Sequence, residues 1–252
     1  MVPMKRVGLA CLLFLFILPL RLNASNVCDN ISLSRIMPYM PPDYRIISKK
    51  LLRDANLCDM LISVNGKIIP VYANSKIAII GSLFKDGKSI SDKEVNAYLS
   101  NQFKKRFDTY GKHLNSLVAA DYFPQPSKRN RFFYLVVDPQ CPYSNNIKND
   151  IKKICNRLKI GAKLIFISKY KGSEDQISSF VCNKKGFSDY LKDNFGNTNR
   201  CKRGSDYIKR SNDLIMDDLR ITDTPTIILP SGKKYSGINT HLIEQFIKNN
   251  TK

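Results

Sequence analysis

Histidine is scarce in this chain of 252 residues, and the sequence patterns that hold a metal or a nucleic acid are missing. His113 and His241 are the two histidines, and neither lies near a cysteine in the sequence. Zinc sites need cysteine and histidine at short, regular spacings. Those spacings are absent, as are aromatic–basic RNA-binding motifs and the nucleophile elbow of a triad hydrolase. The sequence therefore indicates no metal, no cofactor and no nucleic-acid partner.

Long apolar runs are also missing, with one exception at the N-terminus. Lys5 and Arg6 precede an apolar run over residues 7–20, which is the form of a secretory signal peptide. The run is short for a helix that has to cross a hydrocarbon core of about 30 Å. We expect a signal peptide over residues 1–25, cleaved after Ala24, with an uncleaved anchor as the alternative. Export of this kind implies a periplasmic location.

Acidic residues are few relative to basic ones, 21 against 41, which gives a formal net charge of +20. Loss of Lys5, Arg6 and Arg21 with the signal peptide lowers this charge from +20 to +17. Such a balance can indicate acidic partners or a membrane surface, but the lysines are spread along the whole chain. Hydrophobic residues at 43% and charged residues at 25% are ordinary for a globular protein. We interpret the charge as a general surface property.

Seven cysteines are present, and an oxidising compartment lets disulfides persist. Cys11 lies in the signal peptide and leaves with it. The other six are Cys28, Cys58, Cys141, Cys155, Cys182 and Cys201.

The first half of the mature chain predicts a small β meander followed by a helix. Residues 60–90 contain short apolar runs separated by an Asn-Gly pair, a strong hairpin signal, so three or four strands are expected. Ser91 with Glu94 three residues later has the form of a capping box, and apolar residues then recur at helical spacing. Prolines and charges over residues 121–131 predict a loop.

The second half alternates between strands and helices, which is the pattern of an α/β domain. The expected strands cover residues 132–137, 162–168 and 226–229, and residues 234–237 can form a return strand. The expected helices cover residues 142–158, 173–194, 205–219 and 241–248.

Cys141 lies between an apolar strand and the start of a predicted helix. Pro142 suits the first helical position, where its missing N–H would be unpaired in any case. A helix N-terminus presents free N–H groups and a positive dipole end, which favour a thiolate, and the thiolate is the nucleophilic form. These residues favour a reactive cysteine over a buried, inert one.

The residues around Cys141 resemble a known active site. Residues 137–144, Val-Asp-Pro-Gln-Cys-Pro-Tyr-Ser, are similar to the active-site stretch of the DsbC/DsbG group of periplasmic disulfide isomerases, in the thioredoxin superfamily. Thr224 and Pro225 are similar to the cis-proline loop that faces the active cysteine in thioredoxin folds, and cis X–Pro bonds are uncommon and usually purposeful. The family carries a C-P-Y-C or similar C-x-x-C motif, whereas Ser144 stands here in place of the second cysteine.

The resemblance covers nearly the whole mature chain and implies a fold that mixes α+β and α/β architecture. It implies a β-rich, cystatin-like dimerisation domain over residues 26–90 and a linker helix over residues 91–118. A thioredoxin-like catalytic domain with a helical insertion would cover residues 119–252. The resemblance further implies a homodimer, exported cysteine-containing proteins as substrates, and a membrane thiol reductase of the DsbD type as redox partner.

The same resemblance implies roles for individual residues. The catalytic positions are Cys141 and Ser144. The positions implied to contact substrate are Pro142, Tyr143, Thr224 and Pro225. Cys182 and Cys201 fall where the family carries a structural disulfide.

The remaining cysteines are interpreted without help from the family. Cys155 lies 14 residues after Cys141 on what the pattern predicts to be one helix, about 21 Å away at about 1.5 Å per residue. A disulfide needs Cα atoms within about 7 Å, so Cys155 cannot resolve Cys141, and it is interpreted as a buried apolar residue. Cys28 and Cys58 are left over, and we suggest that they pair.

Ser144 decides which reactions are open to the protein. Exchange proceeds by thiolate attack and a mixed disulfide, and a hydroxyl cannot resolve that intermediate as a second thiol does. The first hypothesis is a monothiol disulfide isomerase that uses Cys141. The second is a redox-inactive or weakly active chaperone or assembly factor for a secretion or conjugation apparatus. The third is a reductase of sulfenic acids on other proteins.

Overall fold

The computed structural model describes residues 27–29, 31–125, 129–197 and 200–251. The predicted signal peptide, with Cys11, lies outside the described residues. The chain divides into two compact units, Met1–Asp92 and Lys93–Lys252. Among the described residues, no helix combines the length and the apolar character that crossing a membrane requires.

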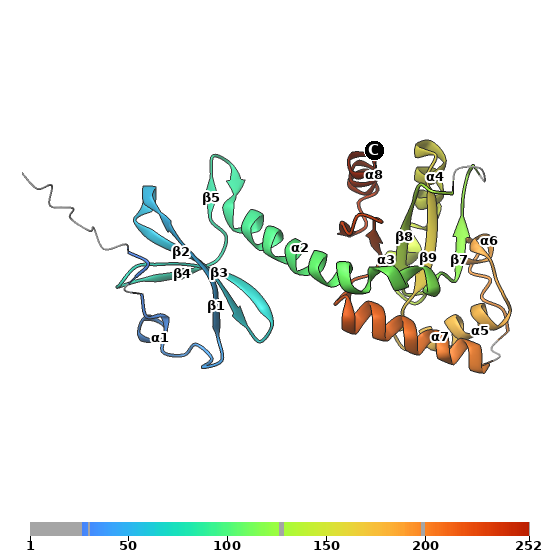
Figure 1. The fold of residues 1–252 in the computed structure, drawn as a ribbon, viewed down its shortest axis with the longest axis horizontal. Coiled ribbons are helices and arrows are strands. Elements are labelled where there is room, and N and C mark those ends of the chain that lie inside the picture. The colour runs from blue at the N-terminus through green and yellow to red at the C-terminus, as the bar shows by residue number, and fades with distance from the viewer. Residues whose placement is uncertain (1–26, 30, 126–128, 198–199, 252) are drawn as a thin grey trace, which may run out of the picture. The chain divides into compact units, whose positions relative to one another are not determined.

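The N-terminal unit is built on an antiparallel sheet with the strand order β1-β2-β3-β4 (Figure 1). Its strands are β1 (Arg45–Leu52), β2 (Leu57–Val64), β3 (Lys67–Ala73) and β4 (Ala78–Ile80). The sequence pattern missed β1, because most of its residues are exposed and its apolar residues do not alternate with polar ones. The Asn65-Gly66 turn joins β2 to β3 as predicted, with positive φ angles of 48° and 77°, which is the conformation of a type I′ hairpin.

Short elements complete this unit. They are α1 (Leu33–Ile36), the 3₁₀ turn η1 (Arg53–Ala55), and the hairpin of β5 (Phe84–Lys85) and β6 (Lys88–Ser89). A small core lies on one face of the sheet, and its buried members are Cys28, Ile31, Leu33, Cys58, Met60, Ile62, Val71 and Ala73. A disulfide joins Cys28 to Cys58, with the Cα atoms 5.0 Å apart, and so attaches the segment before α1 to strand β2.

Helix α2 (Ile90–Tyr110) begins one residue before the predicted start and is capped differently. The Ser89 hydroxyl accepts from the N–H of Asp92 at 3.0 Å, so Ser89 caps the helix. The hydroxyl of Ser91 is instead used inside the unit: it accepts from the N–H of Leu83 at 2.7 Å and lies 2.6 Å from the hydroxyl of Tyr72. The predicted capping role of Ser91 is therefore wrong, because tertiary partners compete for its oxygen. A 3₁₀ segment, η2 (Gly111–Leu117), follows α2.

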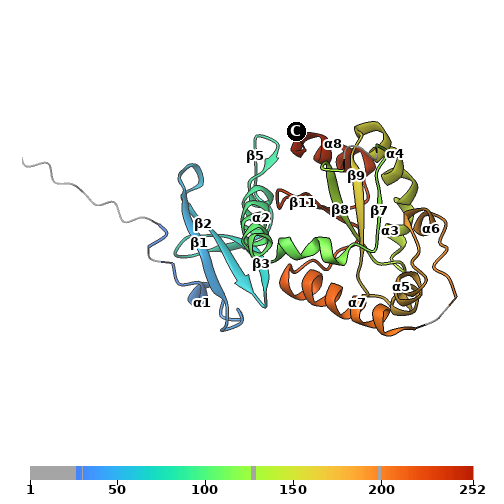
Figure 2. The same ribbon diagram turned by 45° about the vertical axis from the view of Figure 1, so that its right-hand side comes forward.

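The C-terminal unit contains a five-stranded mixed sheet with the order β11-β10-β8-β9-β7. Its strands are β7 (Ala120–Tyr122), β8 (Phe132–Val137), β9 (Gly161–Phe166), β10 (Thr226–Ile228) and β11 (Lys234–Ser236). Strands β8 and β9 run parallel, and the other neighbours are antiparallel. Because β8 and β9 are parallel, the segments that follow them emerge at the same edge of the sheet (Figure 2).

Helices cover both faces of this sheet. They are α3 (Pro142–Asn146), α4 (Lys148–Leu158), α5 (Ser173–Cys182), α6 (Phe187–Leu191), α7 (Lys202–Asn212), the π-helical segment η3 (Asp213–Asp218) and α8 (Thr240–Asn250). Side chains alternate along β8: Phe133 and Leu135 join the core that contains α4, α5 and α8. Tyr134 and Val136 join the core formed by the end of α2, η2 and η3. Burial on both faces explains why β8 reads as a continuous apolar run.

Three predicted boundaries in this unit are wrong. The single helix expected over 142–158 is two helices that meet at Ile147. The helix expected over 173–194 is also divided, into α5 and α6. The predicted loop over 121–131 contains the second half of strand β7, which pairs with β9 at the sheet edge.

Candidate active site

Cys141 is the N-cap residue of α3, with extended backbone angles of φ −75° and ψ 117°, and Pro142 occupies the first turn. The carbonyl of Cys141 accepts from the N–H of Asn145 at 3.2 Å, which closes that turn. The helix that begins here has only five residues before the break at Ile147, so its dipole is smaller than the predicted long helix would supply. Individual N–H groups of the first turn therefore matter more than a long dipole.

The cis-proline loop faces the sulfur of Cys141. The Thr224–Pro225 peptide bond is cis, and the carbonyl oxygen of Thr224 lies 3.4 Å from Cys141 Sγ. The hydroxyl of Thr226 holds the loop in place, because it donates to the carbonyl of Asp223 at 2.6 Å. The fold thus brings together residues that are 83 positions apart in the chain.

The environment lowers the pKa of the Cys141 thiol relative to its ordinary value of 9.0. Burial works against this, since it disfavours the charged form. Hydrogen bonds from the side chain of Thr224, from the backbone and hydroxyl of Ser144, and from the backbone of Tyr143 favour the thiolate and outweigh burial. The thiol can also donate to the Thr224 carbonyl, so the loop has a partner for each protonation state.

Ser144 lies in the first turn of α3 and is shielded from solvent. Its side chain is buried, and its hydroxyl has no hydrogen-bond partner of the usual geometry among the described residues. The hydroxyl is one of the groups that lower the pKa of the Cys141 thiol. Ser144 can therefore donate to a thiolate, but it cannot form a disulfide.

Cys141 is only 1% exposed, although attack on a disulfide requires direct contact between two sulfur atoms. A groove of about 480 Å³ lies between the first turn of α3, the cis-proline loop and the segment after β9. The lining residues are Tyr143, Lys169, Tyr170, Asp223, Thr224, Pro225, Ser236, Gly237 and Ile238. Cys141 itself is not among the lining residues.

The sequence predicted no role for Asp138. In the structure its carboxylate joins the segment before α3 to the segment after β9 by hydrogen bonds. Its carboxylate is fully buried at the end of β8 and accepts from the N–H of Gln140 at 2.7 Å. It also accepts from the N–H groups of Lys169 and Tyr170 at 2.7 and 3.0 Å, and from the hydroxyl of Ser173 at 2.5 Å. The sequence signal was an aspartate directly after an apolar strand. A carboxylate at that position is expected to be buried, and a buried carboxylate needs several hydrogen-bond donors.

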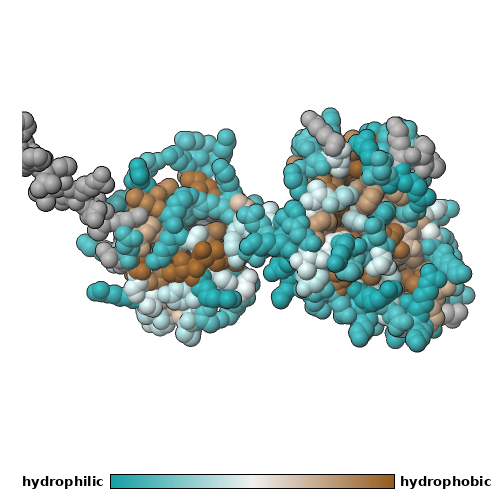
Figure 3. Space-filling view, in the orientation of Figure 1, coloured by the Kyte–Doolittle hydropathy of each residue, from teal (hydrophilic) through white to brown (hydrophobic). Residues whose placement is uncertain are grey.

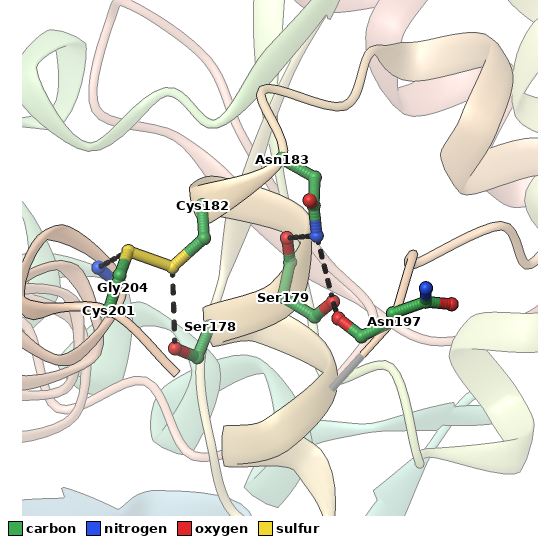
Figure 4. The surroundings of a disulfide bond; sticks show 7 residues. All are labelled: Ser178, Ser179, Cys182, Asn183, Asn197, Cys201 and Gly204. Carbon is green, nitrogen blue, oxygen red and sulfur yellow. Dashed lines mark hydrogen bonds between the residues drawn. A yellow bond between two sulfur atoms is a disulfide. The ribbon is translucent and has the colours of Figure 1, made fainter. Parts of the chain in front are cut away.

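The predicted structural disulfide lies between α5 and α7, where Cys182 and Cys201 have Cα atoms 6.1 Å apart (Figure 4). The N–H of Gly204 donates to the sulfur of Cys201 at 3.4 Å. A Cβ at Gly204 would lie 2.8 Å from the Cα of Ser178, so glycine allows the two helices to approach this closely.

Cys155 is the second free cysteine of the described residues and is fully buried on α4. Burial raises the pKa of its thiol to about 12, so it stays protonated and unreactive. Among the described residues, no group of three or more acidic, cysteine or histidine side chains could hold a metal ion.

Comparisons with known proteins return structures and no sequence relatives. No protein-family model matches the chain, and no curated protein matches it. Helicobacter pylori DsbG has a TM-score of 0.40 and 13% identity, over 76% of this chain and 94% of that one. A linker-deletion mutant of Proteus mirabilis ScsC has a TM-score of 0.45 and 11% identity, over 63% and 87%. The thiol-disulfide exchange protein α-DsbA2 from Wolbachia pipientis has a TM-score of 0.42 and 19% identity, over 60% and 96%.

The C-terminal unit has a thioredoxin-like fold. Its sheet has a parallel β8–β9 pair and antiparallel β10 and β11, and a cis-proline before β10 faces a cysteine at the start of a helix. The predicted mixed α/β and α+β class is confirmed.

Proposed function

We propose that this protein is a periplasmic thiol–disulfide exchange protein, similar to a disulfide isomerase, that attacks with Cys141 alone. The observation that carries the proposal is a cysteine with a lowered pKa, held against a cis-proline loop beside an open groove. A structural cysteine would need none of these features. Cys155 illustrates the contrast, because its buried thiol has a raised pKa and no groove residue beside it.

The reaction balances without a second cysteine. The Cys141 thiolate attacks one sulfur of a non-native disulfide; a bond between Cys141 and that sulfur forms, and the other substrate sulfur leaves as a thiolate. A different thiolate of the same substrate then attacks the substrate sulfur of the mixed disulfide. A new substrate disulfide forms and Cys141 leaves as a thiolate. The substrate is neither oxidised nor reduced overall, so a hydroxyl at Ser144 does not block the cycle.

Trapped adducts test the proposal directly. We expect non-reducing gels of cell extract to show discrete, reducible adducts of the wild-type protein and none with Cys141→Ala. Cys155→Ala is the matched control, because it removes the other free thiol and should leave the adducts in place. Refolding of a scrambled disulfide substrate should follow the same pattern, and refolding by Cys141→Ala at the wild-type rate would refute the role of Cys141.

A second candidate function is that of a chaperone or assembly factor, and the surface of the N-terminal unit favours it. An apolar groove of about 570 Å³ lies in this unit between the segment after α1 and the sheet. Ile77, Ile79, Ile80 and Phe84 are half exposed or more, and Figure 3 shows hydrophobic side chains gathered over this unit. Suppression of aggregation that survives in Cys141→Ala would support this function, and suppression lost in that variant would count against it.

The N-terminal unit and the partners are part of the same proposal. We propose that the sheet of the N-terminal unit mediates homodimerisation, since its edge strand β4 carries exposed isoleucines that a second copy would cover. The substrates would be exported proteins with several cysteines. A membrane thiol reductase of the DsbD type would keep Cys141 reduced. Sedimentation of the purified protein tests the dimer.

A further inference from the structure

The near-complete burial of Cys141 needs an explanation if its thiol is to react. The groove described above is lined by Tyr143, two residues after Cys141, and by Thr224. Tyr170, in the segment between β9 and α5, lines this groove and is itself 41% exposed. It follows the parallel strand next to β8, so the fold places it at the same sheet edge as Cys141.

The backbone of Tyr170 is fixed, whereas its side chain is not enclosed. Its N–H donates to the Asp138 carboxylate at 3.0 Å, and its carbonyl accepts from the N–H of Ser173 at 3.2 Å. The neighbouring Lys169 ammonium donates to the carbonyl of Thr222 at 2.9 Å, which ties the segment to the approach of the cis-proline loop. Because the backbone of this segment is held by hydrogen bonds, the phenol ring can rotate about its side-chain bonds while the segment between β9 and α5 stays in place.

Tyr170 lines the same groove as Thr224, whose carbonyl oxygen lies 3.4 Å from Cys141 Sγ. The charge of the Cys141 thiolate, followed by burial and by hydrogen bonding to the Cys141 side chain, raises the pKa of Tyr170. A neutral phenol beside a thiolate is a donor, and a donor stabilises the ionised sulfur.

We propose that Tyr170 is a further residue of the exchange site: its hydroxyl donates to the Cys141 sulfur, and its ring covers that sulfur until a substrate enters the groove. The inference rests on the proposed function and adds a second task to the groove. The hydroxyl keeps the resting thiolate ionised, and the ring limits attack by small oxidants. An entering polypeptide displaces the ring by filling the space between Tyr143 and the cis-proline loop.

Alkylation of Cys141 by iodoacetamide across a pH range separates the two effects, with mass spectrometry to confirm the labelled residue. Tyr170→Phe keeps the ring and removes the donor, so we expect the midpoint of the pH profile to rise by about one pH unit with an unchanged limiting rate. Tyr170→Ala removes the cover as well, so its limiting rate at high pH should rise several-fold. Tyr170→Leu is the second variant without a ring, should the alanine protein not fold.

Tyr122→Phe is the matched control, because it removes a hydroxyl that donates to Asn156 at 2.7 Å, outside the groove, and should leave both midpoint and limiting rate unchanged. A Tyr170→Phe profile that superimposes on the wild type would overturn the hydrogen bond. A limiting rate in Tyr170→Ala and Tyr170→Leu no higher than in Tyr170→Phe would overturn the cover. Adducts on wild-type Cys141 with unshifted profiles would leave the proposed function standing without this inference. Alkylation profiles that shift as expected, in a protein that forms no adducts through Cys141, would support the role of Tyr170 and count against the proposed function.

Discussion

Replacing Asp138 with asparagine tests whether the buried carboxylate holds the site together. Its two oxygens accept four hydrogen bonds, two on each side. An asparagine side chain replaces one oxygen with an amide that donates. If the amide faces Gln140 and Ser173, the hydroxyl of Ser173 can turn to accept, but the N–H of Gln140 loses its acceptor. If the amide faces the other way, the N–H groups of Lys169 and Tyr170 both lose theirs.

The less costly orientation sets the expected magnitude. One buried N–H without a partner costs about 1–3 kcal/mol, and the remaining bonds weaken because the acceptor is no longer charged. We expect Asp138→Asn to lower the free energy of unfolding by about 2–4 kcal/mol. At a urea dependence of roughly 2 kcal/mol per molar, the unfolding midpoint falls by about 1–2 M. Far-UV circular dichroism is the suitable probe, because most helices belong to the C-terminal unit.

The control is Asp150→Asn, the same chemical change on an exposed helix position. The Asp150 carboxylate is 40% exposed and pairs with Lys153 at 3.1 Å, so its loss should cost less than about 1 kcal/mol. Equal urea midpoints for the two variants would refute the reasoning, because they would show that the four bonds of Asp138 add no net stability. Alkylation of Cys141 provides a second readout, since the freed segment carries Tyr170.

Other predictions concern the cysteines. Ser144→Cys supplies a resolving thiol, so dithiol reductase activity should appear in an insulin-reduction assay while trapped adducts decline; unchanged adducts and no reductase activity would contradict this role of position 144. Alanine at both Cys182 and Cys201 should cost about 3 kcal/mol from loop entropy alone, and an unchanged urea midpoint would argue against it. Alkylation of Cys141 should rise with pH around a midpoint below 9.0, because the thiolate is the reacting form; a midpoint at or above that value would be inconsistent with its surroundings. Cys155 should stay unlabelled over the same range, because burial raises the pKa of its thiol to about 12.

Short sequence patterns correctly predicted the helices, strands and turns that are set by neighbouring residues or by one continuous apolar run or face. The run at Phe132–Val137 is a strand because all its side chains can be buried on two sides of a sheet. The apolar residues at helical spacing along Lys148–Leu158 face one core. The Asn65-Gly66 hairpin follows from backbone angles that few other residues adopt.

Errors arose where a side chain had a distant partner that competes with the local one. Ser91 has a suitable sequence for a cap, but the N–H of Leu83 and the hydroxyl of Tyr72 take its oxygen. The apolar residues of strand β1 stand in adjacent pairs, Ile46–Ile47 and Leu51–Leu52, and do not alternate with polar ones. The strand forms because β2 offers it a hydrogen-bonding edge. No pattern within a short window contains these partners.

The sequence by itself determined that Cys141 begins a helix after an apolar strand, that Ser144 leaves it without a resolving thiol, and that a Thr-Pro pair precedes another strand. Only the tertiary structure decided that Thr224 contacts the sulfur of Cys141. It also decided that Asp138 joins the segment before α3 to the segment after β9, and that Tyr170 lies at the same edge of the sheet as Cys141. The physical reason is that the pKa and the access of a thiol depend on what lies within a few ångströms of it. Parallel pairing of β8 with β9, and antiparallel pairing with β10, bring those neighbours from segments far apart in the chain.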